Sequence, residues 1–495
     1  MIGTSAWEYI SIRSCIFFLH SIAPLSIFYC GVVLFIRPST YRIPRSLEFW
    51  LIGETLFYFT IFLPRKNWLQ HAAAHPSPPS REKRREIFQL CHESVSDPER
   101  YLHMWFLGAA TCEIRRDNVK EFFCWAFLNK AEYGEPDEEE LDEYVNMLEN
   151  ILQRRIEPGR GTAAPLRLTL DKVEMLPRSL AWYSCVFVVD SITYVYMLCH
   201  SFHFHRMTIG RFFTVFPFRP LTLLSPCTTP AKTVTYWHRP HTSTTRLPVL
   251  FIHGIGIGLY PYVNFLAELN HATEGNARDG DVGIIAVEIM PISFRITHGA
   301  LVKEEMCTEI MKILKKHKWE KFVLVTHSYG SVIATHLLRD QTASSMISST
   351  LLIDPVTFLL HHPDVAYNFT YRKPKRANEY QLHYFGSMDM GVAHTLFRTF
   401  FWSENILWKH DISGRRVTVV LSAKDLIVNT DAVGRYLTED EEGVEEKDWK
   451  VKEWKGKGLD ILWFKELDHA QVFDRKANRN ILVNVVRAYS VQAKN

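Results

Sequence analysis

Long apolar stretches dominate the first 70 residues of the chain. Residues 14–36 are almost wholly apolar, and residues 47–63 form a second run that carries Glu48 and Glu54. A helix over the first run is long enough to cross about 30 Å of hydrocarbon, whereas the second run is short for a span. The pattern predicts a membrane anchor or hairpin over residues 1–70, with the second run either spanning or re-entrant.

A cleaved signal peptide is the alternative explanation of the first run. Its polar start is short, the apolar run exceeds the usual length, and no clear small-x-small cleavage site precedes Arg37. We therefore expect an uncleaved anchor. Basic residues flank the second run on both sides, so the pattern leaves the orientation in the membrane open.

Between residues 71 and 230 the pattern becomes that of a largely helical region. Apolar positions recur at helical spacing, at Leu141, Tyr144, Val145, Leu148, Ile151 and Leu152. This stripe predicts an amphipathic helix that packs against a core. Residues 179–204 form a further apolar stretch with a single acid, Asp190, and no lysine or arginine. That stretch either spans a membrane or lies against the membrane or against the rest of the protein.

From residue 231 to residue 495, short apolar runs alternate with helical patterns. Runs of strand type cover residues 247–252, 322–325, 417–421 and 460–465. Such alternation predicts an α/β fold, in which a mostly parallel sheet has helices on both faces. We therefore expect a second domain over residues 231–495.

Residues with catalytic chemistry follow these strand-type runs. Ser328 lies in the sequence Thr-His-Ser-Tyr-Gly, between the run at 322–325 and a helix-like segment. A serine in such a strand–turn–helix is lifted out of the sheet, where a base and a substrate can both reach it. The other runs are followed by a glycine-rich turn at 253–258, by Asp425 and by His469. Glycines in the turn allow backbone N–H groups to face a developing oxyanion.

In this order, the glycine-rich turn, the serine, the acid and the histidine resemble the α/β-hydrolase superfamily over about half of the chain. The resemblance implies an α/β-hydrolase fold with Ser328 as nucleophile, His469 as general base and Asp425 as the acid that orients the histidine. It also implies that the backbone N–H groups of Tyr329 and Ile255 hold the oxyanion.

Several neighbouring residues qualify this assignment. Thr326 stands where the superfamily pattern G-x-S-x-G has its first glycine. Asp354 also ends an apolar strand and is a second candidate for the acid, although we expect it to have a structural role in the turn before Pro355. Asp468, beside His469, is interpreted as a solvated turn residue.

The same resemblance implies a cap at about residues 356–410. This interval is rich in aromatic residues, which suits an apolar acyl chain. A buried helical core would explain the same aromatics equally well. The interval therefore favours a hydrophobic substrate without identifying one.

Composition limits the possible partners. The formal net charge is only +3, which gives no general case for nucleic-acid binding. The nine cysteines are scattered without C-x-x-C spacing, which argues against zinc ligation and favours free thiols. The glycine-rich turn does not have the spacing of a dinucleotide fingerprint. We therefore expect neither a metal nor a cofactor.

Together these features predict a membrane-anchored serine hydrolase that cleaves a hydrophobic, lipid-like carboxylic ester through an acyl-enzyme. Its expected partners are that ester and membrane lipid, and the location that we favour is an intracellular endomembrane. The alternatives are an acyltransferase on the same fold and a non-catalytic membrane scaffold that retained the fold. The sequence leaves the oligomeric state open.

Overall fold

The computed structural model describes residues 2–36, 43–269, 280–440 and 443–491. Within these residues the centre is a nine-stranded sheet in the order β1-β2-β4-β3-β5-β6-β7-β9-β8. Neighbours from β4 through β9 run parallel, whereas β1, β2 and β8 are antiparallel to their neighbours. The strands are β1 (His203–His205), β2 (Thr235–Arg239), β3 (Val249–Ile252), β4 (Ile284–Glu288), β5 (Phe322–His327), β6 (Ile347–Ile353), β7 (Arg416–Ser422), β8 (Trp454–Lys455) and β9 (Leu459–Phe464). The predicted α/β fold with a mostly parallel sheet is confirmed.

Helices cover both faces of the sheet, because its central strands are mostly apolar and the central strand β3 is apolar at every position. In β3, Val249 and Phe251 enter one hydrophobic core, while Leu250 and Ile252 enter another. Successive side chains of a strand point to opposite faces, so such a strand must be buried on both. The first core includes α9 (Val263–Glu268) and α20 (Lys476–Ser490); the second includes α10 (Lys303–Lys316), α11 (Gly330–Arg339), α12 (Gln341–Met346), α18 (Thr430–Thr438) and α19 (Glu446–Trp449).

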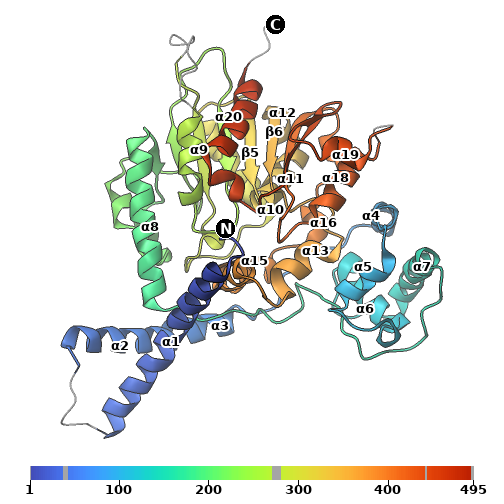
Figure 1. Ribbon diagram of the computed structural model, residues 1–495, viewed down its shortest axis with the longest axis horizontal. Helices are drawn as coiled ribbons and strands as arrows, with labels where there is room; N and C mark the ends of the chain where they lie inside the picture. Colours follow the sequence, from blue (N-terminus) through green and yellow to red (C-terminus); the bar gives the residue numbers. More distant parts are fainter. Residues whose placement is uncertain (1, 37–42, 270–279, 441–442, 492–495) are drawn as a thin grey trace.

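A cap lies between β6 and β7. It consists of α13 (Pro363–Ala366), a π-helical turn (Tyr367–Tyr371), α14 (Ala377–Gln381), a second π-helical turn (Leu382–Ser387), α15 (Met390–Arg398), α16 (Trp402–Asn405) and α17 (Lys409–Ile412). Four helices from the N-terminal half pack beside this cap (Figure 1). They are α4 (Arg81–Glu93), α5 (Pro98–Trp105), α6 (Arg116–Leu128) and α7 (Glu135–Leu152).

Two tryptophans join these four helices to the cap. The indole N–H of Trp402 in the cap donates to the carbonyl oxygen of Ala126 at 2.9 Å. The indole N–H of Trp105 donates to the carbonyl oxygen of His361 at 3.2 Å. On α7, the predicted amphipathic stripe is buried as expected, at Leu141, Tyr144, Val145 and Leu148.

Three helices among the described residues are long and apolar enough to cross a membrane, by length and composition alone. They are α1 (Ala6–Ile36), the continuous helical segment Arg45–Trp68, and α8 (Leu180–Cys199). The segment Arg45–Trp68 comprises α2 (Arg45–Phe57), a π-helical turn (Tyr58–Phe62) and α3 (Leu63–Trp68). Figure 1 shows α1 and α2 projecting from the body of the molecule, whereas α8 stands beside the sheet.

The middle of α8 is attached to the catalytic half by buried charges. The carboxylate of Asp190 forms an ion pair with Arg295 and lies 3.5 Å from the guanidinium of Arg219. Arg219 in turn makes two hydrogen bonds, of 2.8 and 2.9 Å, to Glu288 at the end of β4. Because these partners belong to the sheet and its loops, α8 lies against the rest of the protein, which is one of the arrangements that the sequence left open.

The sheet also begins earlier in the chain than expected. Strand β1, at His203–His205, directly follows α8 and pairs with β2 at the edge of the sheet. The predicted domain start at residue 231 therefore leaves out one strand. Three residues are too few for a periodic pattern to be recognised, and the preceding apolar helix obscures them.

Candidate active site

Ser328 lies in a sharp turn between β5 and α11. Its φ is +52°, a left-handed conformation that costs a non-glycine residue free energy and persists only where its surroundings hold it. The Ser328 amide donates to the carbonyl oxygen of Ile353 at 2.9 Å, and the Ser331 hydroxyl donates to the Ser328 carbonyl oxygen at 2.6 Å. These bonds hold the turn, which directs the serine side chain toward the loops that follow β7 and β9.

Two glycines allow the backbone to pack closely around this turn. A Cβ on Gly254 would lie 2.6 Å from the Cβ of Ser328, and a Cβ on Gly330 would lie 2.5 Å from the carbonyl oxygen of Ile252. Thr326, in the place of the missing motif glycine, is a fully buried residue of β5. The threonine is therefore accommodated within the strand, and the close contacts are made at the two glycines.

The three predicted catalytic side chains form one hydrogen-bonded chain. His469 Nε2 lies 2.8 Å from Ser328 Oγ, and His469 Nδ1 lies 2.7 Å from Asp425 Oδ2. The other oxygen of Asp425 accepts from the backbone N–H groups of Ile427 and Val428, at 2.7 and 2.9 Å. Of the two candidate acids, Asp425 is therefore the one that contacts the imidazole.

Asp354 lies beneath this chain and supports it indirectly. One carboxylate oxygen accepts from the Ser422 hydroxyl at 2.8 Å, and the other accepts from the backbone N–H of Ala470 at 2.9 Å. Burial raises the pKa of Asp354 to about 6; the charge of Asp425 adds to this effect, and that of His469 opposes it. Asp354 thus holds the loop that carries His469.

The electrostatics favour the charged form of His469. Burial by itself lowers the pKa of His469, but the carboxylates of Asp425, Asp354 and Asp468 outweigh it and raise the pKa above its ordinary value. In contrast, burial and the nearby His469 hold the pKa of His327 well below its usual range. The two neighbouring imidazoles therefore differ, because His469 is able to receive a proton whereas His327 stays neutral.

The backbone beside Ser328 offers N–H donors. In the glycine-rich turn, the amide of Gly256 donates to the Ile292 carbonyl oxygen at 3.1 Å, and that of Gly254 to the Tyr262 hydroxyl at 3.4 Å. Between them, the amide of Ile255 has no assigned acceptor among the described residues, and neither has that of Tyr329. Both residues line the same pocket as Ser328, so these two N–H groups could donate to a group bound there.

Asp468 is not the solvated turn residue that the sequence suggested. It is buried, and its Oδ2 accepts from the Asn378 side chain at 2.7 Å. Its Oδ1 accepts from the backbone N–H groups of Leu426 and His469, at 3.0 and 2.7 Å. Asp468 therefore ties the acid loop, the histidine loop and the cap together. Its position next to His469 in the sequence was the only available signal, and it did not reveal the cap partner.

The topology decides the fold. A serine turn follows β5, the acid follows β7 and the histidine follows β9, all at the carboxyl edge of a mostly parallel sheet that begins antiparallel. The chain has the α/β-hydrolase fold.

Comparison with known proteins gives distant similarities. No family model and no curated protein matches the sequence. Among solved structures, a bacterial membrane phospholipase A is 10% identical and aligns over 62% of this chain and 94% of its own, with a TM-score of 0.38. The carboxylesterase CesB of Bacillus subtilis is 12% identical over 60% and 97%, with a TM-score of 0.36. The naproxen esterase of Bacillus subtilis is 9% identical over 60% and 97%, with a TM-score of 0.34.

A small apolar pocket adjoins Ser328 in this hydrolase fold. Its free volume is about 50 Å³. The cap contributes most of its wall, but Trp105, Trp125 and Leu168 come from the N-terminal half of the chain. The sequence did not reveal these three residues, because nothing in a local pattern shows which distant helix will cover a pocket. Almost all of the remaining lining is aliphatic or aromatic.

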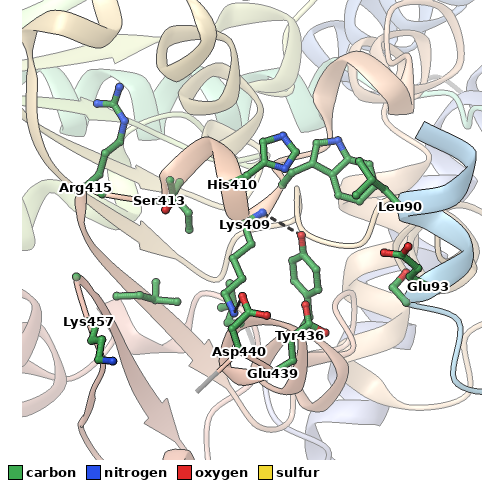
Figure 2. A pocket seen from close by; sticks show the side chains of 17 residues that line it. Leu90, Glu93, Lys409, His410, Ser413, Arg415, Tyr436, Glu439, Asp440 and Lys457 are labelled. Atoms are coloured by element: carbon green, nitrogen blue, oxygen red, sulfur yellow. Dashed lines mark hydrogen bonds and ion pairs between the residues drawn. The ribbon is translucent and has the colours of Figure 1, made fainter. Parts of the chain in front are cut away.

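A larger cavity, of about 540 Å³, lies elsewhere, between α4, α17 and α18 (Figure 2). Within it the Lys409 amide donates to the Tyr436 hydroxyl at 2.9 Å, and the Lys409 ammonium lies 2.7 Å from Asp440. Ser94 in its lining lies 2.5 Å from His361 Nε2, but His361 Nδ1 has no hydrogen-bond partner among the described residues, so no acid orients this imidazole. The chain in which an acid, a histidine and a serine are all hydrogen-bonded adjoins the smaller pocket, at Ser328.

Proposed function

We propose that the protein is a membrane-anchored serine hydrolase that cleaves a hydrophobic carboxylic ester through an acyl-enzyme. The observation that carries this proposal is the hydrogen-bonded chain Ser328–His469–Asp425, which opens onto an apolar pocket. The hydrolase fold alone would not carry it, because one fold hosts many activities.

In the proposed reaction, Ser328 Oγ attacks the ester carbonyl carbon while His469 Nε2 takes the hydroxyl proton. Asp425 holds the imidazole in the tautomer that presents an unprotonated Nε2, and it stabilises the imidazolium that forms. The C–O bond to the alcohol then breaks, and His469 returns its proton to the departing alkoxide. Water, activated by the same imidazole, hydrolyses the acyl-serine and regenerates the free hydroxyl.

The tetrahedral intermediate carries a negative charge on the former carbonyl oxygen. In the proposal the N–H groups of Tyr329 and Ile255 donate to this oxygen. Each is a rigid backbone donor in a site from which water is largely excluded, and loss of one such donor typically costs about 3 kcal/mol of transition-state stabilisation.

The pocket supports a hydrophobic acyl group as the substrate class. Its lining offers few polar groups to a substrate other than the Ser328 hydroxyl and Thr370, so a charged or polar acyl chain would be desolvated without compensation. The free volume of about 50 Å³ is small, which favours a short or slender acyl group unless the cap side chains move. Phe400 lines this pocket and lies next to Tyr329.

Membrane attachment rests on exposed apolar side chains. On α1, Phe17 and Phe35 are 76% and 84% exposed. The segment that follows β1 adds a second exposed group, made of Ile209, Phe213, Phe218, Leu223 and Leu224. Apolar surface on this scale is unfavourable in water and is typical of a membrane contact. An intracellular endomembrane remains our proposal for the compartment.

The anchor contacts the cap directly. The ring of Tyr9 on α1 lies 5.7 Å from that of Tyr380 on α14, and the Arg13 guanidinium lies 4.5 Å above the same Tyr380 ring. The backbone N–H of Ile2 donates to the side chain of Gln381 at 2.9 Å. This contact supports a cap that faces the bilayer, so that a lipid-like ester enters from the membrane side.

Labelling with a fluorophosphonate probe tests the chemistry. The full-length protein in detergent should be labelled, and Ser328→Ala should not be. Ser348→Ala, at the exposed second position of β6, is the matched control and should be labelled like the wild type. Persistent labelling of Ser328→Ala, or none of the wild type, would contradict the proposal and leave the non-catalytic scaffold as the better reading.

A panel of acyl esters tests the substrate class. Phe400→Ala removes a ring from the pocket wall, and it should raise kcat/KM for longer acyl chains relative to short ones by about 10-fold or more. Phe401→Ala is the matched control, because Phe401 is comparably buried but is not part of the pocket lining. Equal profiles for the two variants would contradict the assignment of this pocket. Addition of an alcohol acceptor in the same assay separates transfer from hydrolysis and so tests the acyltransferase alternative.

A further inference from the structure

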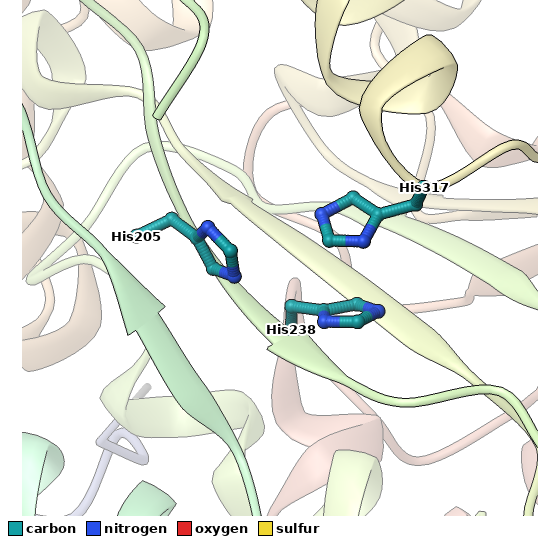
Figure 3. Close-up of side chains that lie close together, drawn as sticks. All are labelled: His205, His238 and His317. Atoms are coloured by element: carbon teal, nitrogen blue, oxygen red, sulfur yellow. The ribbon is translucent and has the colours of Figure 1, made fainter. Parts of the chain in front are cut away.

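Three histidines from separate segments meet at the β1–β2 edge of the sheet (Figure 3). In the antiparallel register of these strands, His203 is opposite His238 and His205 is opposite Tyr236. Opposite residues and residues two apart share a face, so these side chains all lie on one side of the edge. His317, which directly follows α10, reaches the same side. One ring nitrogen from each of His205, His238 and His317 lies within 4.8 Å of the other two.

We propose that His205, His238 and His317 bind one zinc ion. Imidazole nitrogens bind zinc at about 2.0–2.1 Å in a tetrahedral arrangement, so three such nitrogens on one ion are about 3.3 Å apart. The observed spacing therefore requires an inward shift of about 1.5 Å or less, which side-chain rotations supply. A water molecule would complete the tetrahedron.

The three rings have the protonation state that a metal requires. Burial lowers the pKa of His205 to about 4, that of His238 to about 3 and that of His317 to about 4. The charge of Lys316 contributes to the low pKa of all three rings, and its ammonium donates to the carbonyl oxygen of Thr228. At neutral pH each imidazole is therefore uncharged and has a lone pair available.

Tyr236 orients two of the rings. Its hydroxyl lies 3.0 Å from His205 Nδ1 and 2.9 Å from His317 Nε2. Such contacts from outside the ligand set are typical of histidine metal sites. The His205 ring also hydrogen-bonds to the backbone of Thr228, a contact that a zinc ion would have to replace. The His238 ring packs against that of His317, tilted by 34° with ring centroids 3.8 Å apart, so the His238 ring must rotate to face a shared ion. No hydrogen bond is assigned to either of its ring nitrogens in the described chain, and the rotation therefore breaks none.

This cluster is distinct from the proposed active site. Asp354, Asp425 and His469 also have ligand atoms within 4.8 Å of one another. Those atoms, however, are engaged with Ser328, Ser422 and backbone N–H groups. The histidine cluster lies instead where β1, the three-residue edge strand, joins the sheet. A bound zinc would tie β1, β2 and the end of α10 together, and so would stabilise this edge.

Metal analysis of the purified full-length protein tests the site. After equilibration with zinc and removal of excess metal, the wild type should retain one zinc per chain, whereas His238→Asn and His317→Asn should each lose it. His410→Asn is the matched control, because His410 is exposed and outside the cluster. His469→Ala should also keep its zinc, which separates this site from the catalytic residues.

Cobalt substitution of the wild type gives a readout that does not depend on any variant. Cobalt in the zinc site should produce the intense visible absorption of a four-coordinate ion, and zinc should displace it. The proposal is overturned if the wild type retains no stoichiometric metal, if cobalt shows only the weak spectrum of the hydrated ion, or if folded His238→Asn and His317→Asn bind zinc as the wild type does. Fluorophosphonate labelling of Ser328 is independent of all three outcomes.

Discussion

The choice between Asp425 and Asp354 leads to a sharp prediction. In Asp425→Asn, the group 2.7 Å from His469 Nδ1 becomes an amide that can donate as well as accept. The imidazole then favours the tautomer whose Nε2 carries a proton toward Ser328, and it can no longer act as a base. A substitution of this kind reduces kcat by about 10⁴, which corresponds to about 5.4 kcal/mol of activation free energy.

Asp354→Asn is the matched control for this substitution. Its carboxamide can replace both existing hydrogen bonds, by donating to the Ser422 hydroxyl and accepting from the backbone N–H of Ala470. We therefore expect kcat to fall by about 10-fold or less. Because the charge of Asp354 helps to raise the pKa of His469, its loss should also shift the acid limb of the pH–rate profile to lower pH.

Steady-state kinetics on a chromogenic ester, together with the rate of fluorophosphonate labelling, measure both effects. The two variants should show the same thermal unfolding temperature to within a few degrees, so that activity is compared between folded proteins. If Asp354→Asn loses more activity than Asp425→Asn, the geometry has been misread and Asp354 is the acid.

Three further predictions follow from the contacts of the site and the anchor. The kcat/KM should rise with pH through a midpoint above the ordinary pKa of histidine, because only neutral His469 accepts the serine proton and the pKa of His469 is raised. A flat pH profile would exclude His469 as the base. Gly254→Ala should abolish probe labelling at Ser328, because the new methyl group would lie 2.6 Å from the serine Cβ, and wild-type labelling would show that the turn has more room than described. Asp190→Asn should destabilise the protein by about 3 kcal/mol, because Arg295 is buried and would lose its counter-charge. The thermal unfolding temperature should fall, and an unchanged temperature would refute the attachment of α8 through this ion pair.

The local patterns of the chain predicted the fold, and they singled out the three residues that form the hydrogen-bonded chain at Ser328. An apolar run buried on both faces, such as 322–325, is visible in the sequence because neighbouring residues make the strand. The turn at Ser328 is also a local feature, because Ser328 and the neighbouring Gly330 are only two positions apart in the sequence. The strand order placed the serine, the acid and the histidine at one sheet edge, where the structure brings Ser328, His469 and Asp425 together.

Contacts between distant segments were not visible in this way. Asp468 looks like a solvent-exposed turn residue until Asn378 of the cap is placed against it. The pocket wall formed by Trp105 and Trp125 depends on how helices from the N-terminal half dock on the cap. Burial of a polar group is set by what covers it, and the covering residues lie far along the chain.

The apolar stretch at 179–204 illustrates both what the sequence can predict and what it cannot. Its composition alone established a long apolar helix, because every residue contributes to that signal independently. Only the tertiary structure decided where the helix lies, through the pairing of Asp190 with Arg295. The three histidines at the β1–β2 edge follow the same rule, since a register between strands, and not any spacing in the sequence, brings them together.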